Sequence, residues 1–429
     1  MSSSQVKYMD SSGMEPYPEY KDSGIEWIGK IPEHWDILKV KTIFNLIKKP
    51  NFENEPTLLS LTQQGIYVRD ITTFEGQIAQ TYAGYNTIKI GDICLNPMDL
   101  KSGAAAISKY NGIISNAYFT IKEKDKKNTL NEFFAYYFDM HYKYGIFYPF
   151  GTGVGRPEGR GGRWTLSKKT FLNFPLISPP LNEQQAIATF LDRETTRIDA
   201  LVEKKQQFIE LLEERRSSLI SHAVTKGLDP DVPMKDSGIE WIGQIPEHWD
   251  FKKLSYMASL KSGENITSTE FEKYGEYPVF GGNGLRGYFS KYTHEGEYVI
   301  IGRQGALCGN INYTKGKCWV SEHAIVVNPT TKFVTFWMGE LLKAMNLNRY
   351  SISAAQPGIS VENIKKLKIP VPPLQEQQAI ANYLDRETSQ IDTLIEKTEQ
   401  SIEYLKEYRT ALISSAVTGK IDVRGTVSD

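Results

Sequence analysis

The sequence predicts an α+β fold in which two α/β domains are separated by two long helices that pair as an antiparallel coiled coil. Three observations support this prediction. One block of residues occurs twice, a second block with a helical pattern also occurs twice, and the segments between them differ in sequence and length. A chain of 429 residues is long enough for two to four domains with their own cores. We therefore expect one duplicated scaffold with internal pseudo-two-fold symmetry.

The first repeated block is nearly identical in its two copies. Residues 21–36 read KDSGIEWIGKIPEHWD and residues 235–250 read KDSGIEWIGQIPEHWD. His34 and His248 lie in the Pro-Glu-His-Trp part of the block, where we expect a structural turn rather than a catalytic group. The expected structural anchors of this frame are its tryptophans, Trp27, Trp35, Trp241 and Trp249.

The second repeated block has the features of a helix start. Residues 181–204 return, with few changes, as residues 374–397, and two prolines precede each copy. Prolines before a helix, Asn182 as the N-cap and Gln185 three residues later predict that the helix begins here.

Each of these blocks opens a long helix, predicted over 181–226 and 374–420, and Gly227 and Gly419 mark the ends. Apolar residues then recur at steps of three and four, which is the heptad pattern of a coiled coil, with polar interruptions such as Lys205. The predicted seam comprises Ile187, Leu191, Ile198, Leu201, Phe208, Leu212, Ile380, Leu384, Ile391, Leu394, Leu405 and Leu412. A helix with one apolar stripe needs a partner, and each copy is the obvious partner of the other.

The segments between the repeats read as compact α+β domains with irregular loops. Residues 91–121 and 296–327 have a similar rhythm of apolar runs and turns, so the two inserts are expected to share a fold while their loops differ. The predicted strands are 87–90, 92–95, 298–301 and 324–327, and the predicted short helices are 130–140 and 333–345.

The repeats divide the chain into six segments. The polar N-terminus lacks the apolar core of a signal peptide, so we expect a flexible or wrapping tail and a cytoplasmic protein. The scattered cysteines Cys94, Cys308 and Cys318 are expected to be reduced core thiols. The predicted segments are a tail (1–19), a first α/β domain (20–180), a central helix (181–226), a second α/β domain (227–373), a C-terminal helix (374–420) and a tail (421–429).

The net charge of −1 hides an uneven distribution of charge. Residues 51–180 carry 14 Lys and Arg against 11 Asp and Glu, and residues 251–373 carry 15 against 9. The repeated segments hold the compensating negative charge. Because phosphate affinity depends on local counterion release rather than on total charge, the basic inserts are compatible with nucleic-acid binding.

A glycine-rich segment in the first insert, residues 150–155 (FGTGVG), resembles the loop that binds adenosylmethionine. Such a loop must lead into a helix, and the next residues, RPEGRGGR, cannot form one. A flexible cationic loop beside a phosphate backbone fits better, and a plain surface loop is the alternative. The chain contains neither a P-loop lysine motif nor an assembled nucleophile, base and oxyanion donor.

The second insert has small-residue loops at 280–288 and 302–305 that carry Arg, Asn and Gln. These side chains pair bidentately with guanine and adenine edges, although ordinary solvated turns have the same composition. The candidate DNA-binding residues of both inserts are Lys101, Ser102, Arg156, Arg160, Arg163, Asn283, Arg286, Arg303, Gln304, His323 and Gln356.

With these residues in place, the chain resembles the specificity subunit of type I restriction-modification enzymes. The resemblance lies in the KDSGIEWIG and IPEHWD blocks, in the Pro-Pro-Leu-x-Glu-Gln-Gln-Ala-Ile-Ala helix starts and in residues 302–305 (GRQG), and it spans nearly the whole chain. It implies two target-recognition domains, within 20–180 and 227–373, separated by two conserved helices. It also implies a bipartite DNA target, with one half read by each domain.

The resemblance further implies the partners and the division of labour. Two modification (methyltransferase) subunits would bind the helices and terminal blocks, and restriction/translocase subunits would join through them. This chain is then non-catalytic alone and holds no cofactor or metal, whereas S-adenosylmethionine, ATP and Mg²⁺ act in the partners of an adenine-specific methyltransferase and endonuclease complex. Helix length would act as a ruler for the DNA spacer. The alternative is a non-catalytic, tandem-repeat protein-binding scaffold without direct DNA readout, and a self-sufficient enzyme would need a cofactor motif that the sequence lacks.

Overall fold

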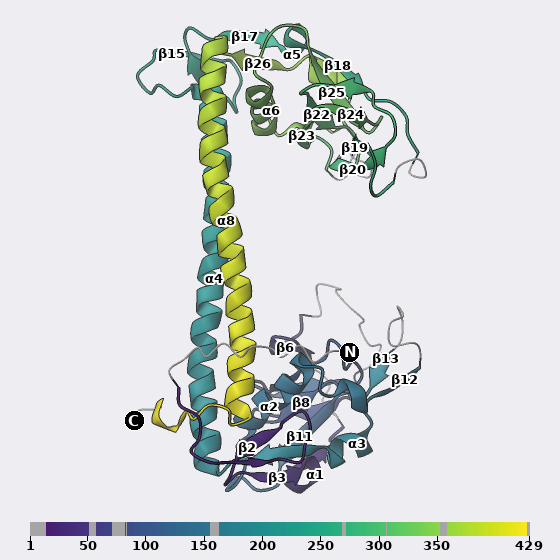
Figure 1. Cartoon of the computed structure of the whole chain (residues 1–429), viewed down its shortest axis with the longest axis vertical. Coiled ribbons are helices and arrows are strands. Elements are labelled where there is room, and N and C mark those ends of the chain that lie inside the picture. The colour runs from purple at the N-terminus through teal and green to yellow at the C-terminus, as the bar shows by residue number, and fades with distance from the viewer. Residues whose placement is uncertain are drawn as a thin grey trace. The chain divides into compact units, whose positions relative to one another are not determined.

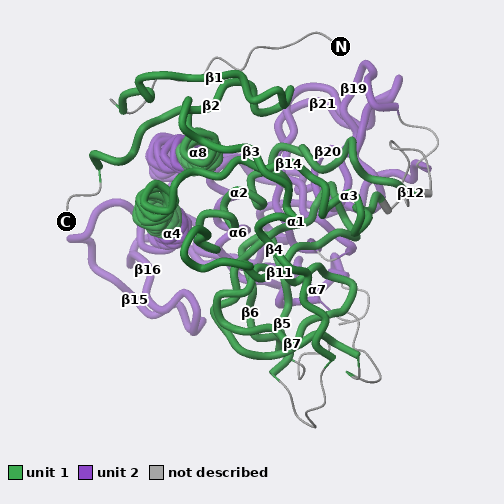
Figure 2. Tube along the Cα trace, turned by 90° about the horizontal axis from the view of Figure 1, so that it is seen from below, with its two compact units in different colours: residues 1–204, 401–429 green, residues 205–400 purple. Residues whose placement is uncertain are grey.

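The computed structural model describes residues 14–50, 57–70, 82, 84–154, 163–267, 272–305, 307–351 and 358–426. The chain forms two compact units, residues 1–204 with 401–429 (unit 1) and residues 205–400 (unit 2), which Figure 2 colours separately. The division falls inside both long helices rather than at their ends. The linear segment boundaries expected from the repeats therefore remain a prediction.

Both units contain a four-stranded antiparallel sheet with the same connectivity. The strand order is β4-β11-β8-β9 in unit 1 and β18-β25-β22-β23 in unit 2, so strands in equivalent positions pair in the same way. These strands are β4 (Phe44–Ile47), β11 (Phe119–Glu123), β8 (Ile93–Leu95) and β9 (Ala105–Ile107), and β18 (Ala258–Ser262), β25 (Ala324–Pro329), β22 (Val299–Gly302) and β23 (Ile311–Tyr313). The prediction that the inserts share a fold is confirmed.

The remaining shared elements surround this sheet in the same chain order. In unit 1 they are β1 (Tyr20–Asp22), β2 (Lys30–Pro32), β3 (Asp36–Lys39), α1 (Val40–Ile43), α2 (Asn131–Lys143), η1 (Tyr148–Phe150), α3 (Lys168–Asn173) and β14 (Pro175–Ser178). In unit 2 they are β15 (Met234–Asp236), β16 (Gln244–Pro246), β17 (Asp250–Lys253), α5 (Leu254–Met257), α6 (Thr335–Ala344), η2 (Leu347–Tyr350), α7 (Val361–Lys365) and β26 (Lys368–Val371). The two short helices and the strands expected from the sequence are all present, within about three residues of the predicted bounds.

The strands added around the shared sheet differ between the units. Unit 1 adds the two-stranded pairs β5-β6, β10-β7 and β12-β13, whereas unit 2 adds a second four-stranded sheet, β20-β19-β24-β21. The bounds are β5 (Leu59–Thr62), β6 (Gly65–Val68), β7 (Asn86–Ile88), β10 (Gly112–Ile114), β12 (Thr152–Val154) and β13 (Arg163–Thr165), and β19 (Tyr277–Gly281), β20 (Gly284–Phe289), β21 (His294–Glu295) and β24 (Lys317–Val320). The sequence divergence of the inserts is thus concentrated outside the shared core.

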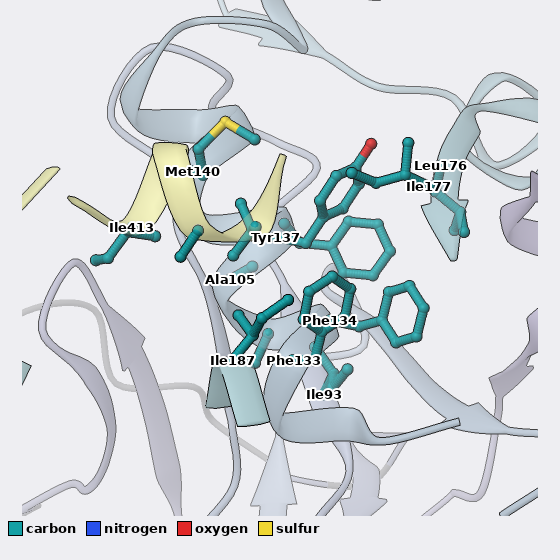
Figure 3. Close-up of a cluster of buried hydrophobic side chains, with 14 of the residues drawn as sticks. Ile93, Ala105, Phe133, Phe134, Tyr137, Met140, Leu176, Ile177, Ile187 and Ile413 are labelled. Carbon is teal, nitrogen blue, oxygen red and sulfur yellow. The ribbon is translucent and has the colours of Figure 1, made fainter. Parts of the chain in front are cut away.

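The core of unit 1 joins the shared four-stranded sheet to both long helices. Phe133 and Phe134 of α2 pack with Ile93 of β8, and the same cluster contains Ile187 of α4 and Ile413 of α8 (Figure 3). Burying such large apolar side chains is the main stabilising contribution to a core. The helices are therefore part of each domain core and not separate rods.

The two long helices are α4 (Leu181–Lys226) and α8 (Leu374–Val417) (Figure 1). Asn182 is not the N-cap, because α4 begins one residue earlier and the Pro180 carbonyl accepts from the N–H groups of Glu183 and Gln184. α4 ends as predicted directly before Gly227, whereas α8 ends at Val417, three residues before the predicted bound and two before Gly419. Both glycines have positive φ, a conformation that glycine adopts without a Cβ penalty. Among the described residues, no helix is long and apolar enough to cross a membrane.

The helices run in opposite directions within each unit. In unit 1 the first half of α4 packs against the last half of α8, and Arg409 Nε lies 3.0 Å from Asp199 Oδ1. In unit 2 the second half of α4 packs against the first half of α8, and Arg216 Nε lies 3.1 Å from Asp392 Oδ1. Each of these residues lies 193 positions from its counterpart in the other ion pair. The pairs are equivalent under the predicted internal two-fold symmetry.

Most of the predicted seam residues are turned away from solvent. The structure buries Ile187, Leu191, Ile198, Leu212, Ile380, Leu384, Ile391 and Leu412 and half-buries Leu405.

The seam prediction was wrong at three positions. Leu201, Phe208 and Leu394 are 40%, 45% and 46% exposed. The half-buried residue is instead the next one along the helix, Val202, Ile209 or Ile395. Steps of three and then four residues place one residue in the seam, and steps of four and then three place the next one. Both fit a repeat of 3.5 residues, and because both residues are apolar at these places, the pattern did not decide between them. In the observed register Lys205 is half-buried and Thr398 is buried, so these polar residues lie in the seam.

The terminal segments are not free tails over the part that the structure describes. Tyr17 is only 2% exposed and Val423 is fully buried, both in the core of unit 1. The Asp422 N–H donates to the Glu15 carbonyl at 2.9 Å, and the Arg424 guanidinium lies 4.9 Å from the centre of the Tyr17 ring. Of the two forms predicted for the N-terminal segment, residues 14–19 take the wrapping one, and residues 421–426 likewise pack onto the core of unit 1.

Candidate nucleic-acid interface

The repeated Pro-Glu-His-Trp turns are bound to the first turn of a long helix. In unit 1 the Trp35 Nε1–H donates to Glu183 Oε2 at 2.8 Å, and His34 Nε2 lies 2.6 Å from Glu183 Oε1. Unit 2 repeats the contact, with Trp249 Nε1 at 2.9 Å and His248 Nε2 at 2.7 Å from the Glu376 carboxylate. Trp35 and Trp249 are buried, and Trp27 and Trp241 are half-buried. Sequence reasoning missed both glutamates, although their presence in both copies was a signal.

A glutamine beside each of these glutamates connects the long helix to the recognition domain. The Leu130 N–H donates to Gln184 Oε1 at 2.8 Å, and the Val334 N–H donates to Gln377 Oε1 at 3.0 Å. Leu130 and Val334 are the N-cap positions of α2 and α6, whose first N–H groups need acceptors. The glutamines thus connect the N-termini of α2 and α6 to the long helices, and sequence reasoning missed them too.

In unit 2 the candidate DNA-binding loops meet at one edge of the two sheets. The Arg303 N–H donates to the His323 carbonyl at 2.9 Å, and the Ile359 N–H donates to the Arg303 carbonyl at 2.9 Å. A Cβ on Gly282 would lie 2.9 Å from the Gln304 carbonyl oxygen, so this close approach requires glycine. Three loops far apart in sequence therefore form one surface, and the fourth contributes Gly358 through its bridge to Gln304.

The side chains on this surface are organised by hydrogen bonds. Arg303 Nη1 donates to Ser262 Oγ at 3.0 Å, Asn310 Nδ2 donates to Asn283 Oδ1 at 3.3 Å, and His323 Nδ1 lies 2.8 Å from Gln304 Oε1. Asn283 and Gln304 are exposed, and the others are at least partly accessible. Exposed polar groups that are held in place can read base edges with less loss of side-chain entropy than mobile ones.

Arg286 lies on β20 at the margin of the same surface. Its side chain is exposed and its aliphatic stem packs over Gly281, which leaves no room for a Cβ at that position. The remaining candidate of the second domain, Gln356, lies outside the described residues.

In unit 1 the structure places only part of the candidate set. The N–H groups of Lys101 and Ser102 donate to Asp99 Oδ1 at 3.0 and 2.9 Å, which forms a tight exposed turn. Gln63 of the β5-β6 hairpin donates from Nε2 to the Ser102 carbonyl at 3.0 Å. Hydrogen bonds thus hold the turn at both residues, and the Lys101 side chain is exposed.

The glycine-rich segment of unit 1 forms strand β12 rather than a cofactor loop. Thr152 pairs with Thr165 and Gly153 pairs with Trp164 of β13, and a side chain at Gly151 would meet the Trp164 ring. Arg163 begins β13 and pairs with Val154, whereas Arg156 and Arg160 lie outside the described residues. A strand at this place cannot present a helix N-terminus to a phosphate.

The strongly shifted titratable groups of unit 1 are structural. Burial lowers the pKa of His141 to about 4, and its Nδ1 lies 2.6 Å from the Tyr137 carbonyl inside the aromatic core. Burial also raises the pKa of the Cys94 thiol above its usual range. All three cysteines are free and buried, and among the described residues no three His, Cys, Asp or Glu side chains form a metal site. Burial therefore favours the neutral form of both side chains, which pack inside unit 1.

Two grooves lie along the helix pair of unit 2. One has a volume of about 570 Å³ and is lined by Phe208, Leu211 and Leu394 together with Arg215 and Glu387. The other, of about 530 Å³, contains His222, Leu228 and Tyr383. The apolar side chains that the seam leaves exposed thus line a surface that is available to a partner.

The comparisons with known proteins agree with this architecture. The family described as type I restriction modification DNA specificity domain matches residues 32–211 and 246–404. The type I restriction enzyme MjaVIII specificity subunit of Methanocaldococcus jannaschii is 24% identical over 92% of this chain and 95% of its own length. The EcoprrI specificity subunit of Escherichia coli is 41% identical, but over only 32% of this chain and 35% of its own length.

Solved structures of low sequence identity share the fold. A chain described under complex assembly and conformational transition of the type I R-M system aligns with a TM-score of 0.67 at 14% identity, covering 90% of this chain and 98% of that chain. The HsdS subunit from Thermoanaerobacter tengcongensis aligns with a TM-score of 0.51 at 15% identity, covering 91% and 98%. Since the two matched segments together cover most of the sequence, the chain belongs to the family of type I restriction-modification DNA specificity proteins and carries two copies of its domain.

Proposed function

We propose that this chain is the specificity subunit of a type I restriction-modification complex and that each recognition domain reads one half of a bipartite, asymmetric DNA target. One observation carries the proposal. The two units share the same sheet order and the same contacts to the long helices, but they add different strands and loops around that core. A shared scaffold with different reading surfaces is what two different half-sites require.

The spacing between the half-sites follows from the helices in this proposal. α4 is continuous over 46 residues, and a helix rises about 1.5 Å per residue, so its length is fixed by residue count. One DNA turn is about 34–36 Å, so a helix pair of this residue count would span a spacer of one or more turns between the two half-sites. The number of heptads would then determine the length of DNA that is left unread.

The catalytic steps belong to partner subunits in this proposal. Two modification subunits would dock on the helix pairs and the terminal segments, and restriction/translocase subunits would join through them in the cytoplasm. The exposed apolar side chains of Phe208, Leu211 and Leu394 support such docking, because they do not pack in the seam of the coiled coil and contiguous exposed apolar surface is typical of protein-binding sites. S-adenosylmethionine, ATP and Mg²⁺ would be bound by those partners.

The experiment that tests the proposal measures duplex binding by the chain with its modification subunits at several salt concentrations. Direct phosphate contacts predict that log K falls linearly with log salt, while Arg303→Ala should relax sequence preference in one half-site only. A protein-binding scaffold without DNA readout would show no salt slope and no sequence preference. Equal weakening of both half-sites would mean that Arg303 contacts phosphate or stabilises the fold.

A further inference from the structure

An exposed arginine, Arg349, lies on the short helix η2, beside the candidate DNA-binding surface of unit 2 that carries Arg303 and Gln304. We propose that Arg349 contacts a backbone phosphate of the DNA next to the second half-site and so helps to position the second recognition domain on the duplex. This inference rests on the proposed function, because it assumes that the surface around Arg303 meets DNA. It adds a residue that the sequence patterns did not identify.

Two aromatic rings hold the guanidinium of Arg349. Its Cζ lies 5.5 Å from the centre of the Trp241 ring and 5.0 Å from the centre of the Tyr350 ring. A cation within about 6 Å of an aromatic centroid is attracted to the ring. The Arg349 Nη2 also donates to the Tyr350 hydroxyl at 2.9 Å. The guanidinium is therefore held in place although the side chain is exposed.

These contacts leave the charge of Arg349 and most of its donors available. A guanidinium has five N–H donors, and the bond to Tyr350 uses one of them. Among the residues that the structure describes, no carboxylate forms an ion pair with Arg349. By contrast, Arg216 and Arg409 of the long helices are each paired with an aspartate. An ordered guanidinium without a carboxylate partner suits phosphate, because arginine binds phosphate bidentately and little side-chain entropy remains to be lost.

The residue before Arg349 packs against the loop between β22 and β23, residues 303–310. The Cys308 thiol donates to Asn348 Oδ1 at 3.2 Å. A Cβ on Gly309 would lie only 2.6 Å from the Asn348 nitrogen, so this close approach requires glycine. The loop that carries the candidate base-reading residues is therefore in direct contact with η2.

The residues after Arg349 lead back to the same surface. The Gly358 N–H donates to Ser351 Oγ at 3.0 Å, and Gly358 also forms a β-bridge with Gln304. Arg349 thus lies between two segments that both contact the loop of residues 303–310. Since the phosphates of a duplex flank the base edges in the groove, the margin of a reading surface is the place for a phosphate contact.

The tryptophan that holds Arg349 belongs to the repeated frame rather than to the variable loops. Trp241 lies in the block 235–250, whose copy at 21–36 is nearly identical. Phosphate contacts fix the register of a protein on the duplex without carrying sequence information, whereas base contacts specify the sequence. A residue held by the frame suits the first of these roles, and Arg303, on the variable loop, suits the second.

The equivalent position in unit 1 carries no charge. Helices η1 and η2 each end at a residue whose N–H donates to the carbonyl three positions back, Gly151 in unit 1 and Ser351 in unit 2. Two positions before these residues stand Pro149 and Arg349. Proline has neither a charge nor a hydrogen-bond donor, so this phosphate contact would belong to the second recognition domain alone.

The test measures duplex binding by the chain with its modification subunits over a range of salt concentrations. Arg349→Ala should weaken binding by the same factor on the target duplex and on duplexes with altered half-sites, so the sequence preference should not change. The slope of log K against log salt should become shallower by about 0.9, the value for one phosphate contact. Arg303→Ala should instead relax the preference in one half-site.

Two further variants separate the charge of Arg349 from its shape and from the total charge. Arg349→Lys keeps the charge, so the slope should stay unchanged, while the affinity falls because lysine lacks the planar fork. Lys368→Ala is the matched control, since Lys368 is exposed and its Nζ lies 5.8 Å from the centre of the Phe251 ring in the separate β17-β26 sheet. This variant should keep the slope of the wild type. Equal slope changes in Lys368→Ala and Arg349→Ala would overturn the assignment, because the slope would then report total charge.

The remaining outcomes separate this inference from the proposed function. An unchanged slope in Arg349→Ala, with salt-dependent and sequence-selective binding by the wild type, would overturn the phosphate contact and leave the proposed function standing. Loss of preference at one base pair would make Arg349 a base reader and would also overturn it. If the wild type shows no salt-dependent, sequence-selective binding, the proposed function fails, and this inference fails with it. If Arg349→Ala does not fold, the slope of Arg349→Gln decides, because glutamine removes the charge but can still donate to Tyr350.

Discussion

The two units differ least where the recognition domain meets the long helices and most where it faces outward. Trp35 and Glu183 in unit 1 repeat as Trp249 and Glu376 in unit 2 with nearly the same distances. The strands outside the shared sheet, by contrast, change in number and pairing. The contacts between each recognition domain and the long helices are therefore the same in the two units, whereas the outer strands and loops, which would contact DNA, differ. Departures from this symmetry are therefore the places to test it.

The largest expected effect is a difference in acid sensitivity. His141 is buried in unit 1 with a pKa of about 4 and lies eleven residues after the N-cap of α2. The residue eleven positions after the N-cap of α6 in unit 2 is Met345, which is also buried. A histidine whose folded pKa lies below its unfolded value contributes stability above the unfolded pKa. The free energy of unfolding of unit 1 should therefore fall by about 3 kcal/mol as the pH falls from about 6.5 to about 4.

The measurement is the free energy of unfolding against pH for the wild type and for His141→Met, which copies the residue of unit 2. The variant should lose most of the pH dependence in that window. An equal pH dependence in the two proteins would contradict the assignment to His141.

The seam of the coiled coil gives the next largest effect, and here the units should agree. Ile198→Ala and the equivalent Ile391→Ala each remove a buried side chain, so each should lower the free energy of unfolding by about 2–4 kcal/mol. Leu201→Ala and Leu394→Ala change exposed residues and should cost less than about 0.5 kcal/mol. Denaturant unfolding checks the contrast, and large effects at 201 and 394 would restore the register first predicted from the sequence.

The glutamate contact should be stronger in unit 1 than in unit 2. The Glu183 side chain is 4% exposed and the Glu376 side chain is 40% exposed, so removing Glu183 leaves the buried Trp35 N–H without an acceptor away from water. Glu183→Ala should cost about 2 kcal/mol and Glu376→Ala about 1 kcal/mol. Thermal unfolding of each variant measures the two costs, and Glu183→Gln is the control that keeps an acceptor. Equal costs for Glu183→Ala and Glu376→Ala would show that burial of the glutamate does not determine the strength of the contact.

The smallest effect concerns the equivalent ion pairs of the helices. Arg409 with Asp199 and Arg216 with Asp392 are exposed to similar extents, and exposed pairs contribute about 0.2–1 kcal/mol. Arg409→Ala and Arg216→Ala should therefore have equal small costs that shrink at high salt. A double-mutant cycle for each pair checks this, and a large difference between the two coupling energies would break the local symmetry.

The sequence predicted the repeated parts better than the unrepeated ones. The duplicated blocks predicted both long helices, because repetition and heptad spacing are visible without structure. The similar rhythm of residues 91–121 and 296–327 predicted the common fold of the inserts. The register failed at Leu201 and Phe208, since periodicity alone could not choose between two adjacent residues. The polar role of Glu183 was missed because its partner, Trp35, lies 148 positions away.

The reading surface could be predicted only as a set of residue types. Arg303, Gln304 and His323 were identified as candidates from their side chains, but nothing local in the sequence indicates that the loops around 282, 303 and 323 meet. Their meeting depends on long-range strand pairing and on the small size of Gly282.

The most direct test of the duplicated scaffold replaces residues 235–373 with a second copy of residues 21–180, so that both helices carry the same reader. The target of this chain, in complex with its modification subunits, is then determined by mapping methylated sites in genomic DNA. If each domain reads one half-site, the target should be palindromic and composed of two inverted copies of the first half-site. Retention of the original asymmetric target, or a target that contains neither half-site, would contradict it.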